Sequence, residues 1–428
     1  MDQIQAKLID IDEALTMIGN NFSIVTSMAA AEPTKFFEHI HERLRAVDGV
    51  EIHCANPLKQ YPCFQDESLS GRVNINVMFL TCAVRQNAQV NFVQYVPQHL
   101  SQWVRNLVET KKINVFWGSC TVPDERGYVS LGTGACYEPE ILSQADLVIL
   151  EINEHLPTTY GATTVRLEDV DYFIENHHDL SEVPRSNISE VDKKIGQLIS
   201  TLVEDGSTLQ LGIGSIPDAI GAALQSKKNL GIHTEMINDT MMQLATLGVV
   251  NGRMKSIWPN KIVGAFAFGS KELYDFIDHN PMVELQPASV VNDPYRIGRN
   301  HQMMSINTAV EIDVTGQVCS ESIGHVEISG VGGASETHIG AQRSQGGRGI
   351  VAVRSTAKND TLSKIVFELK PGSKVSISRN DIDTVVTEYG IARLRGKSTA
   401  ERALSLIEIA HPKFREQLTG QCKEVGYI

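Results

Sequence analysis

Residues 209–214 read Leu209-Gln210-Leu211-Gly212-Ile213-Gly214, and this stretch indicates the fold more clearly than any other part of the chain. An apolar strand runs into a glycine turn, and then into Pro217 and helix-forming residues. A second short strand candidate further along ends at a lone carboxylate, Glu235. In an α/β fold the carboxyl ends of neighbouring strands face one crevice, in which ligands bind. The pattern therefore predicts Glu235 as a nucleophile toward a nucleotide-bearing substrate.

The composition is that of a globular, enzyme-sized protein. The 428 residues exceed one ordinary core, so we expect two domains or more. Hydrophobic residues make up 42% and charged residues 21%, which is typical of such proteins. The net charge of −13 argues against a nucleic-acid partner, because phosphates attract a surplus of Lys and Arg.

The sequence carries no visible targeting or membrane segment. The N-terminal residues are acidic rather than basic, and no long apolar stretch follows them, so no secretory signal is visible. Apolar runs such as 146–152 and 262–268 are too short to cross a bilayer. We therefore expect a cytoplasmic protein with no membrane partner.

The cysteines and histidines do not form a ligand pattern. The seven cysteines are odd in number and scattered, without a Cys-x-x-Cys pair. The thirteen histidines include His39, His41 and the pair His177-His178, none of them near a second group of ligands. This predicts reduced, mostly buried thiols and no metal site.

Strand and helix patterns alternate along the chain, which predicts an α/β architecture with largely parallel strands. The polar stretch 176–185 contains Pro184 and marks the expected domain boundary. We therefore expect domains at 1–185 and 186–428, with Ser189 as the N-cap of the helix that opens the second. The apolar strand candidates include 73–80, 115–118, 147–152, 209–211, 262–268, 350–353, 375–377 and 384–387.

The glycine turn has two interpretations. The dinucleotide fingerprint requires a third glycine where Pro217 stands, so an NAD-binding turn is disfavoured. What remains is a turn whose backbone N–H groups meet a helix start, which suits an anion. The alternative is a tight strand-to-helix turn with no ligand, and the turn alone does not decide between them. Taken alone, Glu235 fits an exposed loop carboxylate better than a catalytic residue, so its assignment depends on the neighbouring glycine segments.

A second glycine segment, 328–334, supports a catalytic interpretation. Gly330, Gly332 and Gly333 let the backbone approach a ligand closely and present N–H groups to it. Such a loop can form an oxyanion hole for a thioester carbonyl oxygen, whereas the alternative is a flexible turn. A Gly-x-Ser-x-Gly motif is absent, and 390–398 lacks the glycine that a phosphate-binding P-loop needs.

Taken in order, these segments resemble the acetyl-CoA hydrolase/transferase family of class I CoA-transferases, and most of all its 4-hydroxybutyrate and butyrate:acetate CoA-transferase branch. The resemblance covers most of the chain, and each segment is weak alone but specific in combination. The segments that carry it are 121–132, 209–217, 231–236, 306–311, 329–333, 385–392 and 394–398.

The resemblance implies two open α/β domains with the active site between them. It implies ping-pong transfer of CoA from a short-chain acyl-CoA to a carboxylic acid, with no tightly bound cofactor and with CoA as a substrate. Glu235 falls on the family's glutamate, which forms a glutamyl-CoA thioester. We expect this carboxylate to be ionised at neutral pH without a raised pKa or a metal ion. A homodimer is expected on the same ground.

The resemblance also assigns binding residues. Gln210, Leu211, Gly212, Ile213 and Gly214 would line the CoA. Asn307 and Gly330 would contact CoA or the thioester oxygen, with Gly332 and Gly333 shaping that loop, and Lys358 would lie near a CoA phosphate. The glycine-free segment 77–82 departs from the family in the half that should shape the acyl pocket, which leaves the acyl group open.

Three alternatives remain. An acyl-CoA hydrolase would use the same intermediate and release it to water. A CoA-binding or regulatory protein would keep the fold without catalysis, which the intact Glu235 disfavours. A dehydrogenase is disfavoured by Pro217.

Overall fold

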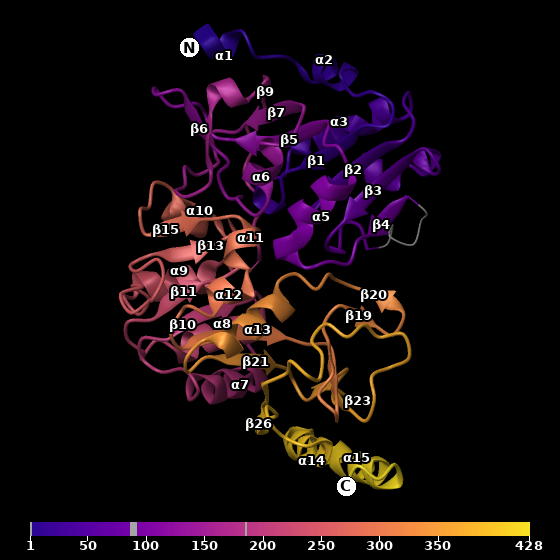
Figure 1. Ribbon diagram of the computed structural model, residues 1–428, viewed down its shortest axis with the longest axis vertical. Helices are drawn as coiled ribbons and strands as arrows, with labels where there is room; N and C mark the ends of the chain where they lie inside the picture. Colours follow the sequence, from indigo (N-terminus) through magenta and orange to yellow (C-terminus); the bar gives the residue numbers. More distant parts are fainter. Residues whose placement is uncertain (1, 86–91, 185) are drawn as a thin grey trace. The chain divides into compact units, whose positions relative to one another are not determined.

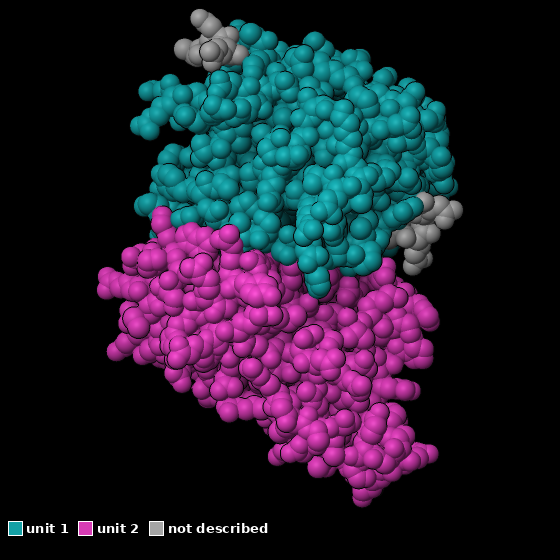
Figure 2. Space-filling view, viewed as in Figure 1, with its two compact units in different colours: residues 1–183, 263–291 teal, residues 184–262, 292–428 magenta. Residues whose placement is uncertain are grey.

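The computed structural model describes residues 2–85, 92–184 and 186–428, and the chain forms two compact units (Figures 1 and 2). Unit 1 comprises Met1–Val183 and Val263–Val291, and unit 2 comprises Pro184–Ile262 and Asn292–Ile428. Both units combine parallel sheets with helices, so the α/β class expected from the sequence is confirmed. The expected division at 185/186 assigned 263–291 to the second domain, whereas the structure packs this segment with the first.

Unit 1 is built on a seven-stranded sheet in the order β4-β3-β2-β1-β5-β7-β9. Every neighbouring pair in it is parallel. The interior strand β5 is buried along its whole length, as expected for a parallel sheet covered on both faces. The strands are β1 (Ser23–Thr26), β2 (Val50–Cys54), β3 (Val73–Val77), β4 (Val93–Tyr95), β5 (Val115–Cys120), β7 (Leu147–Ile152) and β9 (Tyr172–Glu175).

The helices of unit 1 include α3 (Thr34–Leu44), which lies beside the sheet (Figure 1). Its residues Phe36, Phe37 and Ile40 are buried in the core. These apolar residues recur at helical spacing, which forms the buried stripe. The other helices of this unit are α1 (Asp2–Gln5), α2 (Ile11–Thr16), α4 (Pro62–Gln65), α5 (Trp103–Thr110), α6 (Glu138–Leu142), α10 (Lys271–Ile277) and α11 (Ala288–Val291).

Backbone hydrogen bonds explain why 263–291 belongs to unit 1. The amide of Ala135 donates to the Ala265 carbonyl at 3.0 Å, and that of Ala267 donates to Thr133 at 2.8 Å. Gly161 lies against β15 (Val283–Leu285), where a Cβ would overlap the Leu285 backbone. Such pairings between distant segments leave no local mark in the sequence, so the expected boundary did not include them.

Unit 2 is built on strands in the order β11-β10-β16-β21-β25-β26. The first five are parallel, and β26 pairs antiparallel to β25. The strands expected at 209–211, 350–353 and 384–387 are present, whereas 375–377 contributes only an isolated bridge between Val318 and Ile377. The strands are β10 (Thr208–Leu211), β11 (Gly231–His233), β16 (Met303–Thr308), β21 (Arg348–Ala352), β25 (Thr384–Thr387) and β26 (Gly390–Arg393).

The helices of unit 2 begin with α7 (Glu190–Ser200), whose N-cap is Ser189, as expected. Ser189 and Asp192 form a reciprocal capping box, which satisfies two free amides of the first turn. The remaining helices are α8 (Ser215–Ala223), α9 (Asp239–Thr246), α12 (Pro294–Ile297), α13 (Ala334–Arg343), α14 (Thr399–Ile409) and α15 (Pro412–Glu424).

The parallel strands of unit 2 place several candidate residues at one edge of the sheet. The glycine turn follows β10, Glu235 follows β11, and Asn307 lies near the end of β16. Because parallel strands share a direction, these residues all stand at the carboxyl edge, where α/β sheets bind ligands.

Two further findings concern the whole described chain. No helix in residues 2–85, 92–184 and 186–428 is long and apolar enough to cross a membrane. The seven cysteines are free thiols, and all except Cys82 are buried, which confirms the expectation of mostly buried, reduced cysteines.

Candidate functional site

The glycine turn joins β10 to α8 and presents unused backbone donors. Gly214 has a φ of 112°, a conformation that favours glycine, and it caps α8. Within the described part of the chain, the amides of Gly212, Ile213 and Gly214 donate to no protein acceptor. A Cβ at Gly212 or Gly214 would meet no atom within 4 Å, so open space lies beside both. Free amides at a helix start suit an anionic ligand.

The five residues expected to line the CoA do not all face this space. Leu211 is 1% exposed and belongs to the core, and Gln210 is 5% exposed. Ile213, by contrast, is 46% exposed at the tip of the turn. The turn therefore offers its glycines and Ile213 to a ligand, while Leu211 lies beneath them.

Glu235 stands two residues after the end of β11 and is held by two donors. The Nδ2 of Asn292 donates to its Oε2 at 2.9 Å, and the backbone N–H of Gly333 donates to the same carboxylate. Gly333 is the N-cap of α13, so the carboxylate lies at the positive end of a helix. Thr234, which precedes it, donates instead to the Met236 carbonyl at 3.2 Å.

The pKa of the Glu235 carboxyl is raised to about 7, mainly by burial and in smaller part by the nearby carboxylate of Glu336. The donors on Asn292 and Gly333 act in the opposite direction and lower this pKa. The expectation of a carboxylate ionised at neutral pH without a raised pKa is therefore wrong in respect of the pKa. Removal from water penalises the charged form, and that effect exceeds the effect of the two hydrogen bonds.

The second glycine segment meets Glu235 through Gly333. A Cβ at this position would overlap both the Glu235 carboxylate and the Asn292 amide, so any other residue there would displace these two side chains. Gly332 has a φ of 53°, which bends the chain into α13. Gly330 lies earlier in the same loop and is half-buried. The loop predicted as an oxyanion hole thus packs on the predicted nucleophile.

Gln210 and Asn307 lie on adjacent strands and share a network of hydrogen bonds. The hydroxyl of Ser305 donates to Gln210 Oε1 at 2.8 Å, and Asn307 Nδ2 donates to Ser305 Oγ at 3.0 Å. Thr337 joins from α13, and its hydroxyl donates to Ser305 Oγ at 2.9 Å, since the single Ser305 proton is used toward Gln210. The sheet register explains this arrangement, because Gln210 pairs with Ser305. The network links β10, the strand before the glycine turn, to β16 and α13.

Lys358 is not brought into this group. It lies exposed at the tip of the hairpin between β22 (Thr356–Ala357) and β23 (Leu362–Ser363), with a φ of 50°. Its role near a CoA phosphate stays a prediction.

Asn292 is the functional residue that the sequence did not reveal. It is fully buried between α11 and α12, and it reaches Glu235 across 57 positions of the chain. Asparagine in a short polar break is an ordinary turn residue, so nothing in the local pattern distinguishes it. Its Oδ1 has no hydrogen-bond partner among the described residues.

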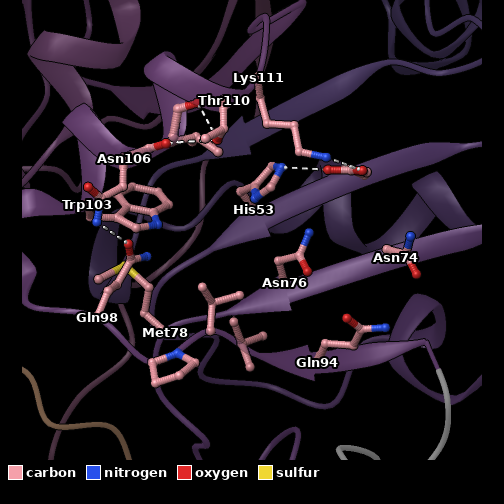
Figure 3. A pocket seen from close by; sticks show the side chains of 15 residues that line it. His53, Asn74, Asn76, Met78, Gln94, Gln98, Trp103, Asn106, Thr110 and Lys111 are labelled. Atoms are coloured by element: carbon pink, nitrogen blue, oxygen red, sulfur yellow. Dashed lines mark hydrogen bonds and ion pairs between the residues drawn. The ribbon is translucent and has the colours of Figure 1, made fainter.

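Unit 1 contains a separate hollow of about 500 Å³, shown in Figure 3. Asn74, Asn76 and Gln94 lie along strands β3 and β4, and Trp103 comes from α5. In this lining Glu51 pairs with Lys111 at 2.7 Å and lies 3.4 Å from Nε2 of His53. None of the predicted site residues lies here, and the lining combines amide side chains with apolar ones such as Met78, Trp103 and Leu107. The role of the N-terminal half in acyl recognition stays a prediction.

Comparison with known protein families matches both halves of the chain. Residues 1–183 match the acetyl-CoA hydrolase/transferase N-terminal domain, and residues 269–422 match the corresponding C-terminal domain. A 4-hydroxybutyrate coenzyme A transferase from Clostridium kluyveri is 40% identical and aligns over 98% of this chain and 97% of its own. A butyryl-CoA:acetate CoA-transferase from Anaerostipes caccae is 31% identical over 97% and 96%.

The chain is also similar to a solved structure and, more distantly, to an acetyl-CoA hydrolase. RipA from Yersinia pestis superposes with a TM-score of 0.95 at 32% identity, covering 100% of this chain and 99% of its own. An acetyl-CoA hydrolase from Yarrowia lipolytica is more distant, with 23% identity over 78% of this chain and 71% of its own. The similarity is thus greater to proteins named as transferases than to this hydrolase.

Proposed function

Because this chain belongs to the acetyl-CoA hydrolase/transferase family, we propose that it moves CoA from a short-chain acyl-CoA to acetate or a similar carboxylate. 4-Hydroxybutyryl-CoA and butyryl-CoA are the proposed donors, since relatives that act on these acyl groups cover nearly the whole chain. The observation that carries the proposal is the Glu235 carboxylate at the carboxyl edge of the sheet, which accepts from Asn292 at 2.9 Å and from the Gly333 amide.

In the first half-reaction the Glu235 carboxylate attacks the thioester carbonyl of the acyl-CoA. The C–S bond breaks, which gives an acyl-glutamyl anhydride and the CoA thiolate. The thiolate then attacks the glutamyl carbonyl, and the acyl group leaves as a free carboxylate. The product is a glutamyl-CoA thioester, so one difficult exchange is divided into easier steps.

In the second half-reaction the acceptor carboxylate attacks the glutamyl-CoA thioester and releases the thiolate. The thiolate attacks the acceptor's acyl carbon in the resulting anhydride, which forms the new acyl-CoA and restores Glu235. We assign the backbone of Gly330 and Gly332 to the oxyanion that forms at each attack. Preorganised amides of this kind typically contribute about 3–4 kcal/mol.

The glycine turn is the proposed binding site for the CoA portion of the substrate. Free amides of Gly212, Ile213 and Gly214 adjoin open space, and this arrangement supports an anionic ligand there. Glu235 and the turn follow neighbouring parallel strands, so a ligand that lies on the turn has its reactive end within reach of one sheet edge.

The second candidate is hydrolysis of acyl-CoA, in which water intercepts the same glutamyl-CoA intermediate. The family includes hydrolases, which is the specific reason to test it. Release of CoA from butyryl-CoA should be measured with and without acetate. A transferase needs the acid and forms acetyl-CoA, whereas a hydrolase releases CoA without it.

Glu235→Gln tests the nucleophile directly. The variant keeps the shape and an acceptor oxygen for Asn292 but cannot form the anhydride, so transfer should fall to background while the protein folds. Full transfer activity in this variant would exclude Glu235 as the nucleophile. A homodimer and a cytoplasmic location remain predictions from the sequence, and light scattering and cell fractionation would test them.

A further inference from the structure

One arginine connects the glycine turn to two other elements of unit 2. Arg354 lies two residues after the end of β21 and stands at the carboxyl edge of the sheet. Its Nε and Nη2 donate to the two carboxylate oxygens of Asp192 at 2.8 and 2.7 Å. The same Nη2 donates to the hydroxyl of Ser215 at 3.0 Å. Ser215 is the first residue of α8 and follows Gly214 directly.

The two partners of Arg354 differ in kind. Asp192 belongs to α7, its side chain is fully buried, and it also accepts from the amide and hydroxyl of Ser189. Burial acts to raise the pKa of Asp192, but the hydrogen bonds from Arg354 and Ser189 hold that pKa below its ordinary value. Arg354 and Asp192 therefore form a charged, bidentate ion pair, and the guanidinium in that pair also donates to the neutral hydroxyl of Ser215.

The chain around Arg354 is itself fixed. Glu388, which follows β25, accepts from the amide and the hydroxyl of Ser355 at 2.9 and 2.6 Å. The amide of Lys364 donates to the Ser355 carbonyl at 2.8 Å. The backbone next to Arg354 is thus hydrogen-bonded to two other segments, which fixes the position from which the guanidinium extends.

The other side of the turn has its own contact. The Nδ2 of Asn238 donates to the Gly212 carbonyl at 2.8 Å. Between this contact and the Arg354–Ser215 bond lie the three amides that donate to no described acceptor. Gly214, at φ 112°, makes this segment dependent on outside contacts, because glycine has the widest choice of backbone conformations.

We propose that Arg354 is a positioning residue for substrate binding: by bridging Asp192 and Ser215 it fixes the first turn of α8, and with it the free amides of the glycine turn. This inference rests on the proposed function, in which that turn binds the CoA portion of the substrate. Arg354 acts through Ser215 and not on the reacting atoms, so its effect falls on binding of acyl-CoA rather than on chemistry at Glu235.

The test compares Arg354→Gln, Arg354→Lys and Ser215→Ala in the full chain, with butyryl-CoA and acetate as substrates. We expect Arg354→Gln to raise KM for butyryl-CoA by about ten-fold or more, with kcat and KM for acetate changed far less, since small displacements of a binding element cost up to about 10²-fold. Arg354→Lys should not restore KM, because an ammonium cannot reproduce the planar fork. Ser215→Ala keeps the ion pair and should give a smaller rise in the same constant.

The matched control is Arg166→Gln in unit 1. Arg166 forms the same bidentate contact with Asp169, at 2.9 Å for both hydrogen bonds, at an exposed site. This variant should leave both KM values unchanged. Wild-type KM for butyryl-CoA in both Arg354 variants would overturn the proposal, as would full rescue by lysine.

A second measurement separates this proposal from the proposed function. The dissociation constant for CoA itself, measured by calorimetry, should rise in Arg354→Gln and in Ser215→Ala. If the wild-type protein binds CoA but does not transfer it between acids, the proposed function is wrong. The dissociation constants of the variants for CoA still test the role of Arg354 in that case. Equal CoA affinity in the wild type and both variants, with unchanged melting temperatures, would refute the positioning role. If Arg354→Gln fails to fold, Ser215→Ala alone decides the outcome.

Discussion

The raised pKa of Glu235 predicts an acid limb in the pH profile of the first half-reaction. Burial moves this pKa from 4.5 to about 7, and only the carboxylate form attacks a thioester. With a pKa near 7, about half of the side chains are ionised at pH 7 and about one in eleven at pH 6. The value of kcat/KM for butyryl-CoA should therefore fall about five-fold between pH 7 and pH 6. An unshifted carboxylate would give almost no change over that interval.

Asn292→Leu should move this limb to higher pH. Leucine matches the shape of the fully buried asparagine but removes the 2.9 Å hydrogen bond to Glu235. A hydrogen bond to a charged group is worth about 1.5–3 kcal/mol, which corresponds to about one to two pKa units. At pH 7 the variant should lose about 5- to 50-fold in kcat/KM, and most of that loss should be recovered as the pH rises.

Glu336→Gln provides the control with the opposite sign. The charge of Glu336 raises the pKa of Glu235, so its removal should move the limb to lower pH. The assay is the initial rate of acetyl-CoA formation at pH 5.5–9, with melting temperatures to verify folding. A profile that is flat between pH 6 and pH 8, or a limb that moves in the same direction in both variants, would refute this account of the site.

Three further predictions concern the same site. Gly333→Ala should abolish transfer without unfolding the protein, because its methyl group would overlap the Glu235 carboxylate. The control is Gly420→Ala, whose methyl group would meet no atom within 4 Å and which should retain wild-type kinetics. Equal activity of the two variants would contradict the contact assigned to Gly333. Gly212→Ala also has no neighbour within 4 Å, so it should melt like the wild type but show a raised KM for butyryl-CoA, and an unchanged KM would separate the turn from substrate binding. Glu235→Gln should raise the melting temperature at pH 8 more than at pH 5. Because the pKa of Glu235 in the folded protein is raised from 4.5 to about 7, the stability linked to its proton is complete below pH 4.5 and is lost as the pH rises through 7, by at most about 3 kcal/mol. Equal gains in melting temperature at both pH values would contradict the raised pKa.

The sequence predicted the parts of the site that lie within one strand-turn-helix unit. The apolar run before Gly212 forms β10, and the glycine turn leads into α8. Pro217 stands at the third position of that helix, where a missing amide is tolerated in the first turn. These features have local causes, namely periodicity, glycine conformation and helix capping, and a single sequence displays such causes.

The parts that could not be predicted depend on contacts between distant segments. Asn292 reaches Glu235 across 57 positions, and Arg354 reaches Asp192 across 162. The raised pKa of Glu235 has the same origin, because burial depends on everything that packs around the carboxylate. The placement of 263–291 in unit 1 likewise rests on backbone pairing with residues such as Thr133 and Ala135. No spacing or composition in the sequence indicates these pairs.

The most direct test of the central claim is mass spectrometry of the tryptic peptide 229–253, which contains Glu235. The protein is incubated with butyryl-CoA and then with borohydride, which reduces an enzyme thioester to an alcohol. The account predicts a loss of mass at Glu235 that requires both the acyl-CoA and the borohydride. The Glu235→Gln variant should show no such loss. An unmodified Glu235 after incubation with butyryl-, acetyl- and 4-hydroxybutyryl-CoA would contradict the glutamyl-CoA intermediate.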